Sequence, residues 1–113
     1  MRIEIKGRKL AVSDDLRQRV ERRFEKISRQ VSPLAELEVE LSEERNPRVA
    51  DSQVAEATLH VKGTTLRARA QASSMVTAIN EVSADLSRQV KRLNDKKRGR
   101  RAATPAPPAT ASP

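Results

Sequence analysis

The sequence predicts an α+β domain with the element order β-α-β-β-β-α, in which two helices pack on one face of a four-stranded sheet. Two stretches carry apolar residues at helical spacing, and four stretches alternate between apolar and polar residues with a period of two. The 113 residues suffice for one small domain. Packing both helices on one side of the sheet buries every apolar face together.

The first half of the chain begins with a short strand over residues 2–6, where Ile3 and Ile5 share one face. Ser13 is a suitable N-cap for the first helix, and the two aspartates after it suit the positive helix end. The apolar stripe of this helix comprises Leu16, Val20, Phe24, Ile27 and Val31. We expect Pro33 to end the segment.

Three further strands follow. Residues 36–42 alternate, with Glu36, Glu38 and Glu40 on the polar face, and residues 43–52 contain Asn46-Pro47 and indicate a loop. Residues 55–61 and 66–70 alternate again on either side of Lys62-Gly63, so they predict a hairpin.

The second helix is capped by Ser73 or Ser74 and extends to about Arg98, roughly 37 Å at the usual helical rise. Its apolar stripe comprises Met75, Ile79, Val82, Leu86, Val90 and Leu93. From Ala102 the chain is uncharged and rich in Ala and Pro. We therefore divide the chain into a folded domain, residues 1–98, and a disordered linker or tail, residues 99–113.

The net charge of +8 is unevenly distributed. Residues 1–35 hold ten basic and five acidic groups, a net charge of +5, and residues 36–61 hold two basic and seven acidic groups, a net charge of −5. Residues 62–72 add three basic groups, and residues 73–113 hold eight basic and three acidic groups, a net charge of +5. The helices are therefore basic and the middle strands acidic. Such asymmetry attracts and orients a protein on a polyanion.

Each helix carries a cationic side. In the first helix one broad side holds Arg19, Arg22, Arg23, Lys26 and Arg29, while Glu21 and Glu25 lie elsewhere around the axis. In the second helix basic residues are dense from Arg88 to Arg101, with Asp95 as the one acid. Charged runs are usually solvated helix faces. Because two helices share the excess here, polyanion binding is the preferred interpretation.

Several function classes are disfavoured. Cysteine is absent, which excludes disulfides and thiolate sites, and His60, the one histidine, has no second His or Cys to join in metal binding or base catalysis. The carboxylates of residues 36–40 more often pair with bases such as Arg67 and Arg69 across the sheet than bind a cation. We expect no enzyme, no metal and no cofactor. No apolar run approaches the ~20 residues of a membrane span, so we expect no membrane partner and a cytoplasmic location.

Three ordered segments resemble one known family. They are Gly7-Arg8-Lys9-Leu10 leading to residues 13–17 (SDDLR), residues 57–63 (ATLHVKG), and residues 74–80 (SMVTAIN) followed by residues 86–90 (LSRQV). Across roughly residues 1–98 the chain is similar to the ribosome hibernation-promoting factors, also called ribosome-associated inhibitors or sigma-54 modulation proteins.

The resemblance implies the β-α-β-β-β-α fold, which is similar to double-stranded-RNA-binding domains. It also implies a non-catalytic factor of stationary phase or stress. It would bind the small ribosomal subunit between head and body, contacting 16S-type rRNA and ribosomal proteins, and compete with mRNA, A- and P-site tRNA and initiation factors. Residue by residue, the family's RNA contacts fall on Arg17, Arg23 and Lys26 in the first helix and on Arg88, Gln89, Arg92 and Lys96 in the second. Charge alone adds Arg19, Arg22, Arg29 and Lys91 to this candidate site.

The chain departs from the family pattern at five positions. Ser74, Val76 and Asn80 stand where members usually have Asp, Tyr and Asp, and Asp85 and Asn94 stand where many have Lys. Long members continue through a linker into a small domain that pairs two ribosomes. The Ala/Pro-rich tail suggests the N-terminal domain of such a long form, and ribosome dimerisation is expected only if that second domain follows.

Two other hypotheses remain. One is a general double-stranded RNA or DNA binder without ribosome specificity, which would prefer free duplexes to ribosomes. The other is a protein-interaction module, whose binding would survive high salt.

Overall fold

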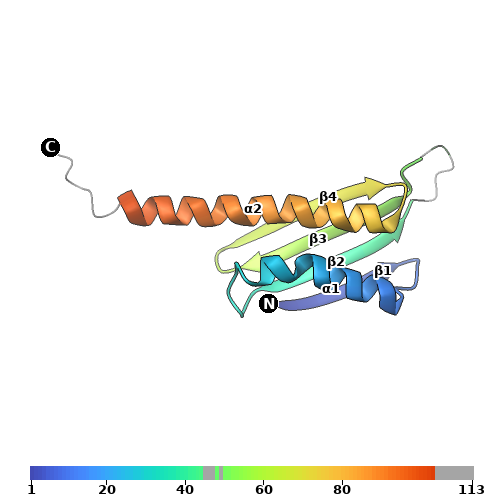
Figure 1. Cartoon of the computed structure of the whole chain (residues 1–113), viewed down its shortest axis with the longest axis horizontal. Coiled ribbons are helices and arrows are strands. Elements are labelled where there is room, and N and C mark those ends of the chain that lie inside the picture. Colours follow the sequence, from blue (N-terminus) through green and yellow to red (C-terminus); the bar gives the residue numbers. More distant parts are fainter. Residues whose placement is uncertain (45–47, 49, 104–113) are drawn as a thin grey trace.

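The computed structural model confirms the order β-α-β-β-β-α and describes residues 1–44, 48 and 50–103, with side chains up to Lys97 (Figure 1). The elements are β1 (Arg2–Arg8), α1 (Asp14–Ser28), β2 (Glu36–Glu43), β3 (Gln53–Val61), β4 (Thr64–Ala72) and α2 (Met75–Ala103). The strands form one sheet in the order β1-β2-β3-β4. β1 pairs with β2 in parallel, and the other two pairs are antiparallel.

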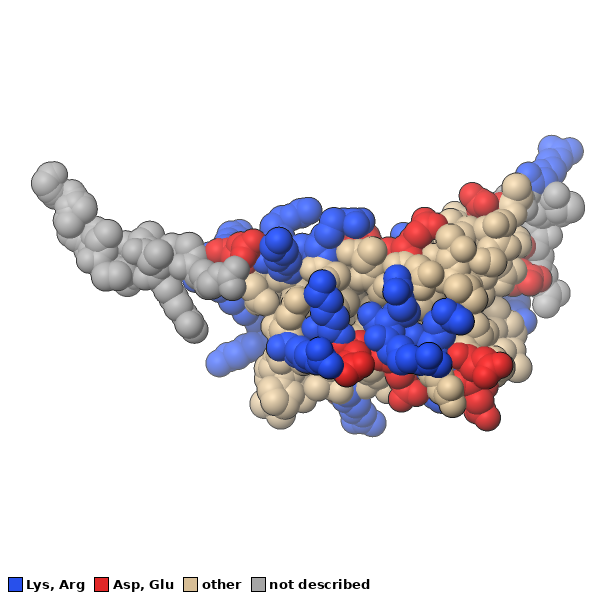
Figure 2. Space-filling model, in the orientation of Figure 1, with Lys and Arg blue, Asp and Glu red and all other residues tan. Residues whose placement is uncertain are grey.

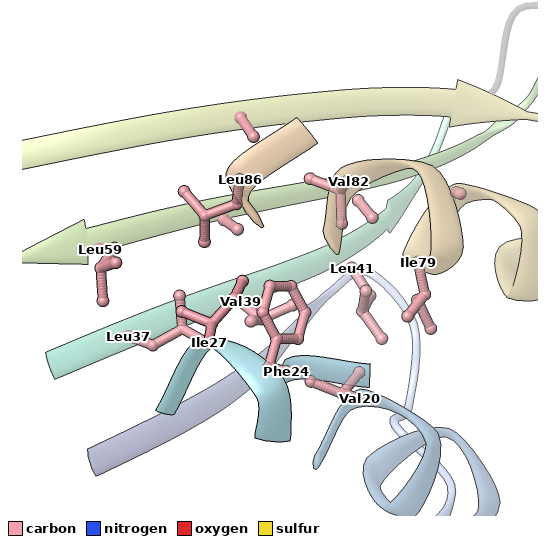
Figure 3. Packing of buried hydrophobic residues seen from close by; sticks show 14 of the residues in the cluster. Val20, Phe24, Ile27, Leu37, Val39, Leu41, Leu59, Ile79, Val82 and Leu86 are labelled. Atoms are coloured by element: carbon pink, nitrogen blue, oxygen red, sulfur yellow. The ribbon is translucent and has the colours of Figure 1, made fainter. Parts of the chain in front are cut away.

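The core fills the space between the sheet and the two helices, which cover the same face (Figure 3). From α1, Val20, Phe24 and Ile27 are buried. They join the alternate residues of β2 and β3 that face the helices and the apolar stripe of α2. The period-two and period-3.6 patterns therefore meet in one apolar layer, which is the arrangement that the sequence predicts.

Both predicted helix caps are confirmed. The Leu16 N–H donates to the Ser13 side-chain oxygen over 3.2 Å. The Thr77 N–H likewise donates to the Ser74 side chain over 3.2 Å, and the Ala78 N–H donates to the Ser74 carbonyl. Ser74, rather than Ser73, is therefore the N-cap of α2.

Both helices end at places that differ from the expectation. α1 ends at Ser28, and the N–H groups of Arg29 and Gln30 turn back to carbonyls of its last turn, so Val31 packs on the core from the loop that follows. α2 continues to Ala103, because Lys, Arg and Ala are good helix formers and its one glycine does not interrupt them. Residues 99–103 of the predicted tail are thus helical, and residues 104–113 lie outside the described part.

The connections depend on two glycines. Gly63 has φ of +80° in the tight turn between β3 and β4, as the hairpin prediction required. At Gly7 a Cβ would collide with the carbonyl oxygen of Leu10 and approach Val12 Cγ2 to 3.0 Å. The chain can therefore fold back after β1 toward α1 only without a side chain at position 7.

Candidate nucleic-acid interface

The cationic residues of α1 lie on its solvent side. Arg19, Arg22, Arg23 and Lys26 are all exposed, as is Arg29 just beyond the helix end. Figure 2 shows lysine and arginine side chains gathered over α1 and along α2 on the face that carries the helices. Arg17 is exposed too, but it lies about 120° around the helix axis from Arg23, on the side of Glu21. The structure therefore groups five of the six predicted α1-segment residues and sets Arg17 apart.

The cationic residues of α2 follow the flank that borders β4. Arg92, Lys96 and Gln89 line a shallow hollow with Leu66 of β4. One turn earlier, Arg88 lines a neighbouring hollow with Arg69 and Gln71 of β4. Lys91 is exposed on the same helix, between this flank and α1. We call the set Arg88, Gln89, Arg92 and Lys96 the β4 flank.

Two side-chain amides fix α2 in this position. Gln89 Nε2 donates to the Arg67 carbonyl at the edge of β4 over 2.7 Å. On the opposite side of the helix, Asn94 Nδ2 donates to the Gln30 carbonyl after α1 over 3.2 Å. Asn94 therefore ties the two helical segments together, and a lysine there would present a charge instead of this link.

Most of the predicted cations lack an anionic partner among the described residues. Two exceptions exist: Arg29 Nη2 lies 2.7 Å from Glu25 Oε1, and Arg88 Nη2 lies 3.6 Å from Asp85 Oδ1. The eight other predicted cations form no ion pair within the described side chains: Arg17, Arg19, Arg22, Arg23, Lys26, Lys91, Arg92 and Lys96. Their charge is consequently available to an external anion.

The uncovered face of the sheet is electrically balanced instead. Its outward positions hold five basic residues, Arg2, Lys6, Arg8, Arg67 and Arg69, and five acidic ones, Glu4, Glu36, Glu38, Glu40 and Glu56. The Glu4 carboxylate, hydrogen-bonded to Lys6, raises the pKa of that amine, and the charges of Glu38 and Glu40 add to the effect. The net positive charge is thus concentrated on the helix side.

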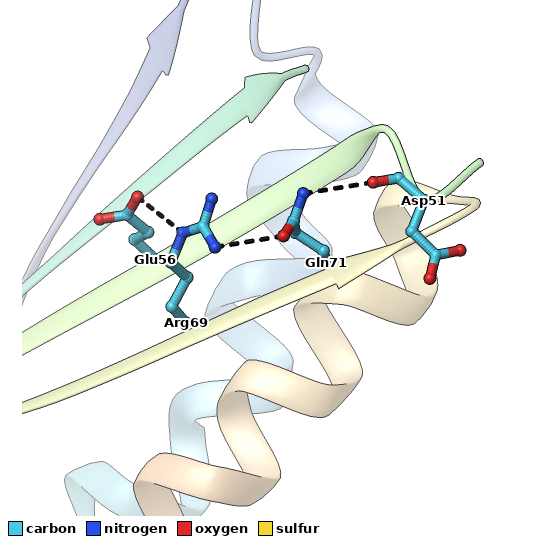
Figure 4. Close-up of polar contacts among 4 residues, drawn as sticks. All are labelled: Asp51, Glu56, Arg69 and Gln71. Carbon is cyan, nitrogen blue, oxygen red and sulfur yellow. Dashed lines mark hydrogen bonds and ion pairs between the residues drawn. The ribbon is translucent and has the colours of Figure 1, made fainter. Parts of the chain in front are cut away.

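One predicted pairing on this face is wrong. Arg67 and Arg69 lie on β4, which β3 separates from the glutamates of β2. Arg69 Nε instead contacts Glu56 Oε1 on β3 over 3.3 Å (Figure 4). Arg69 also donates to Gln71, whose amide donates to the Asp51 carbonyl. This network links β3, β4 and the loop before β3, so Arg69 has a structural role.

The described residues offer little for other chemistry. His60 is exposed on the uncovered face, with Nε2 3.8 Å from Glu38 Oε2. No group of three potential metal ligands occurs among the described residues. No described helix combines the length and apolarity needed to cross a membrane.

Sequence reasoning missed the hollow beside the β4 flank. Its apolar members, Leu66 and Leu93, belong to the apolar faces of their elements, so each was expected to pack on the core. Both are half-buried, since each lies at the rim of the core. No sequence signal separates a core position from a rim position without knowledge of where α2 crosses β4.

Fold and charge together define a small α+β domain with one cationic helical face and one balanced sheet face. Residues 3–98 match the family model described as Sigma 54 modulation protein / S30EA ribosomal protein. The chain therefore belongs to this family, as the sequence resemblance indicated.

Similar proteins carry consistent names. A ribosome hibernation promotion factor of Picosynechococcus is 29% identical over 102 residues, covering 89% of this chain and 53% of that protein, so the chain spans about half of that relative. A ribosome hibernation promoting factor of Salmonella typhimurium is 30% identical, with 85% of this chain and 96% of that protein covered. A factor of the same name from Azotobacter vinelandii is 31% identical, with 85% of each chain covered.

Solved structures share the fold. The N-terminal domain of Thermus thermophilus Protein Y superposes with a TM-score of 0.71 at 26% identity, covering 82% of this chain and 99% of that one. A ribosomal subunit interface protein from Coxiella burnetii gives a TM-score of 0.68 at 16% identity, covering 84% and 99%, and at that identity it supports the fold alone.

Proposed function

We propose that this protein is a ribosome hibernation factor that binds the small ribosomal subunit in the decoding channel. There it occludes mRNA, A- and P-site tRNA and initiation factors, and so keeps idle ribosomes inactive and protected. The observation that carries the proposal is the sorting of charge: unpaired cations cover the helix face, whereas the sheet face is balanced. Membership of the family and the names of its relatives support the ribosome as the target.

The proposed mechanism requires only that the protein occupy its site on the ribosome, and no covalent bond is made or broken. Exposed lysines and arginines of both helices neutralise phosphates of folded rRNA, and the rigid sheet holds the two helices at a fixed separation. The arrangement suits an RNA surface that contacts α1 and the β4 flank together. Because the acidic strand positions lie on the other face, one orientation is strongly preferred.

The direct test is co-sedimentation with isolated small subunits in sucrose gradients, with and without initiator tRNA. The expected result is that protein and tRNA exclude each other from the same subunit. Simultaneous binding would contradict occlusion of the decoding channel. A preference for free RNA or DNA duplexes over subunits would favour a general duplex binder instead.

Replacing Asp85 is expected to strengthen binding. Asp85 engages Arg88 on the β4 flank over 3.6 Å, where the Arg88 side chain is 66% exposed and the Asp85 side chain 42% exposed. Asp85→Asn removes this competitor, so the existing phosphate contact of Arg88 becomes stronger. The expected gain in affinity is about threefold at 0.1 M salt, less than the roughly eightfold of a complete additional contact. Fluorescence titration of small subunits measures the gain.

The matched control for this variant is Glu36→Gln, which changes the net charge equally on the uncovered sheet face. It is expected to leave affinity within about twofold, because its charge lies away from the RNA. An equal gain in both variants would mean that only overall charge matters.

A further inference from the structure

The hollow beside the β4 flank combines an apolar floor with a cationic rim. Its volume is about 210 Å³, and its lining consists of Leu66, Gln89, Arg92, Leu93 and Lys96. The two leucines are half-buried, while Arg92 and Lys96 are exposed. No acidic side chain belongs to this lining. An occupant with an apolar surface and an attached negative charge therefore fits best.

Gln89 adds a fixed hydrogen-bonding group. Its Nε2 is held by the Arg67 carbonyl at the edge of β4 over 2.7 Å. Its Oε1 accepts no hydrogen bond from the described residues, so it retains acceptor capacity at the wall of the hollow. An amide anchored at one atom presents the other in a defined place, which suits recognition of a donor group.

The size of the hollow narrows the choice of occupant. Sites for drug-sized ligands usually measure about 300–1,000 Å³, so this one accommodates a single flat ring system. A nucleobase has an apolar face, and three of the four types carry an exocyclic amino group that can donate. In RNA, a backbone phosphate lies on either side of the nucleotide that carries the base. Guanidinium planes and apolar side chains are known surfaces for unstacked bases.

We propose that this hollow receives one unpaired base of the bound RNA. The base packs on Leu66 and Leu93 with the Arg92 guanidinium over its ring, and an exocyclic amino group donates to Gln89 Oε1. Lys96 neutralises an adjacent phosphate. The proposal rests on the RNA-binding function proposed above and adds a base contact to its phosphate contacts. The chain has no Trp or Tyr, and its one Phe, Phe24, is buried, so the surface for the base has to come from leucines and a guanidinium group.

The test compares Leu93→Ala with Val76→Ala. Val76 is 37% exposed in the first turn of the same helix and lies outside the hollow. Leu93→Ala is expected to weaken binding to small subunits roughly tenfold, the size of one lost base contact. Its salt dependence should stay unchanged, because no phosphate contact is lost. Val76→Ala should bind like the unaltered protein.

Chemical probing at saturating protein identifies the base. One unpaired adenine or cytosine of the subunit RNA should be shielded from dimethyl sulfate, or one unpaired guanine from kethoxal, by the unaltered protein and react again with Leu93→Ala. Leu93→Met, which keeps the floor apolar, should restore both affinity and protection. Thermal melting of each variant verifies that the fold is retained.

The outcomes separate this inference from the proposed function. If the unaltered protein binds subunits while Leu93→Ala binds equally well and exposes no base, the inference is wrong and the function stands. A shallower salt dependence of Leu93→Ala, or photo-crosslinking from position 66 to a ribosomal protein in place of RNA, also overturns it. Failure of the unaltered protein to bind subunits overturns the proposed function itself.

Discussion

Neutralising Arg88, Arg92 and Lys96 together, each to Gln, is expected to lower the affinity for small ribosomal subunits about 500-fold at 0.1 M salt. Each phosphate contact contributes about eightfold under these conditions through release of counterions, and three contacts multiply. All three side chains are exposed on the β4 flank, so their removal leaves the core untouched. Titration with fluorescently labelled protein measures the loss.

The salt dependence of the affinity is a second measurement that tests the same prediction. If the unaltered protein makes about six phosphate contacts, its affinity should drop on the order of a thousandfold between 50 and 200 mM salt, and the slope should halve in the triple variant. An affinity that salt does not change would instead indicate a protein-interaction module.

The matched control is the triple variant Arg2→Gln, Lys6→Gln and Arg67→Gln. These three residues are exposed on the uncovered sheet face and carry the same total charge. This variant is expected to bind within a few-fold of the unaltered protein. Equal losses in both triple variants would contradict the assignment of the helix face.

Truncating Phe24 to Ala is expected to destabilise the fold by about 3–5 kcal/mol. Phe24 is fully buried between α1 and the sheet, where it helps to fill the core (Figure 3). Small domains have about 5–15 kcal/mol of stability in total, so the loss is a large part of it. Urea denaturation followed by circular dichroism measures the change.

Leu34→Ala is the control for this variant. Leu34 is 89% exposed in the loop between α1 and β2, so its truncation is expected to change stability by less than about 0.5 kcal/mol. Similar losses in both variants would mean that Phe24 does not belong to a tightly packed core.

Much of the fold could be predicted because local patterns carry it. Leu37, Val39 and Leu41 alternate with glutamates, and that alternation survives in the structure as a buried face and a solvated face. Ser13 and Ser74 cap their helices because a side-chain oxygen satisfies N–H groups that every helix start leaves free. These are interactions within a few residues, which the sequence displays directly.

Pairings between distant strands were less predictable. Period-two alternation indicates which side of a strand is polar, but it does not indicate which strands are neighbours in the sheet. The expected contact of Arg67 and Arg69 with the β2 glutamates therefore failed, because β3 lies between them. The helix ends also shifted, since capping and helix propensity compete over single residues there.

The amino-acid sequence alone determined the order of elements, the composition of the core and the excess of positive charge on the two helices, because all three depend on residue type and local spacing. Tertiary structure decided where this charge lies. The crossing of α2 over β4 places Arg92 and Lys96 beside Leu66, while Asn94 on the other side meets Gln30. The physical reason is that helix packing on the sheet selects which flank of each helix meets its neighbour, and this depends on contacts between residues far apart in the chain.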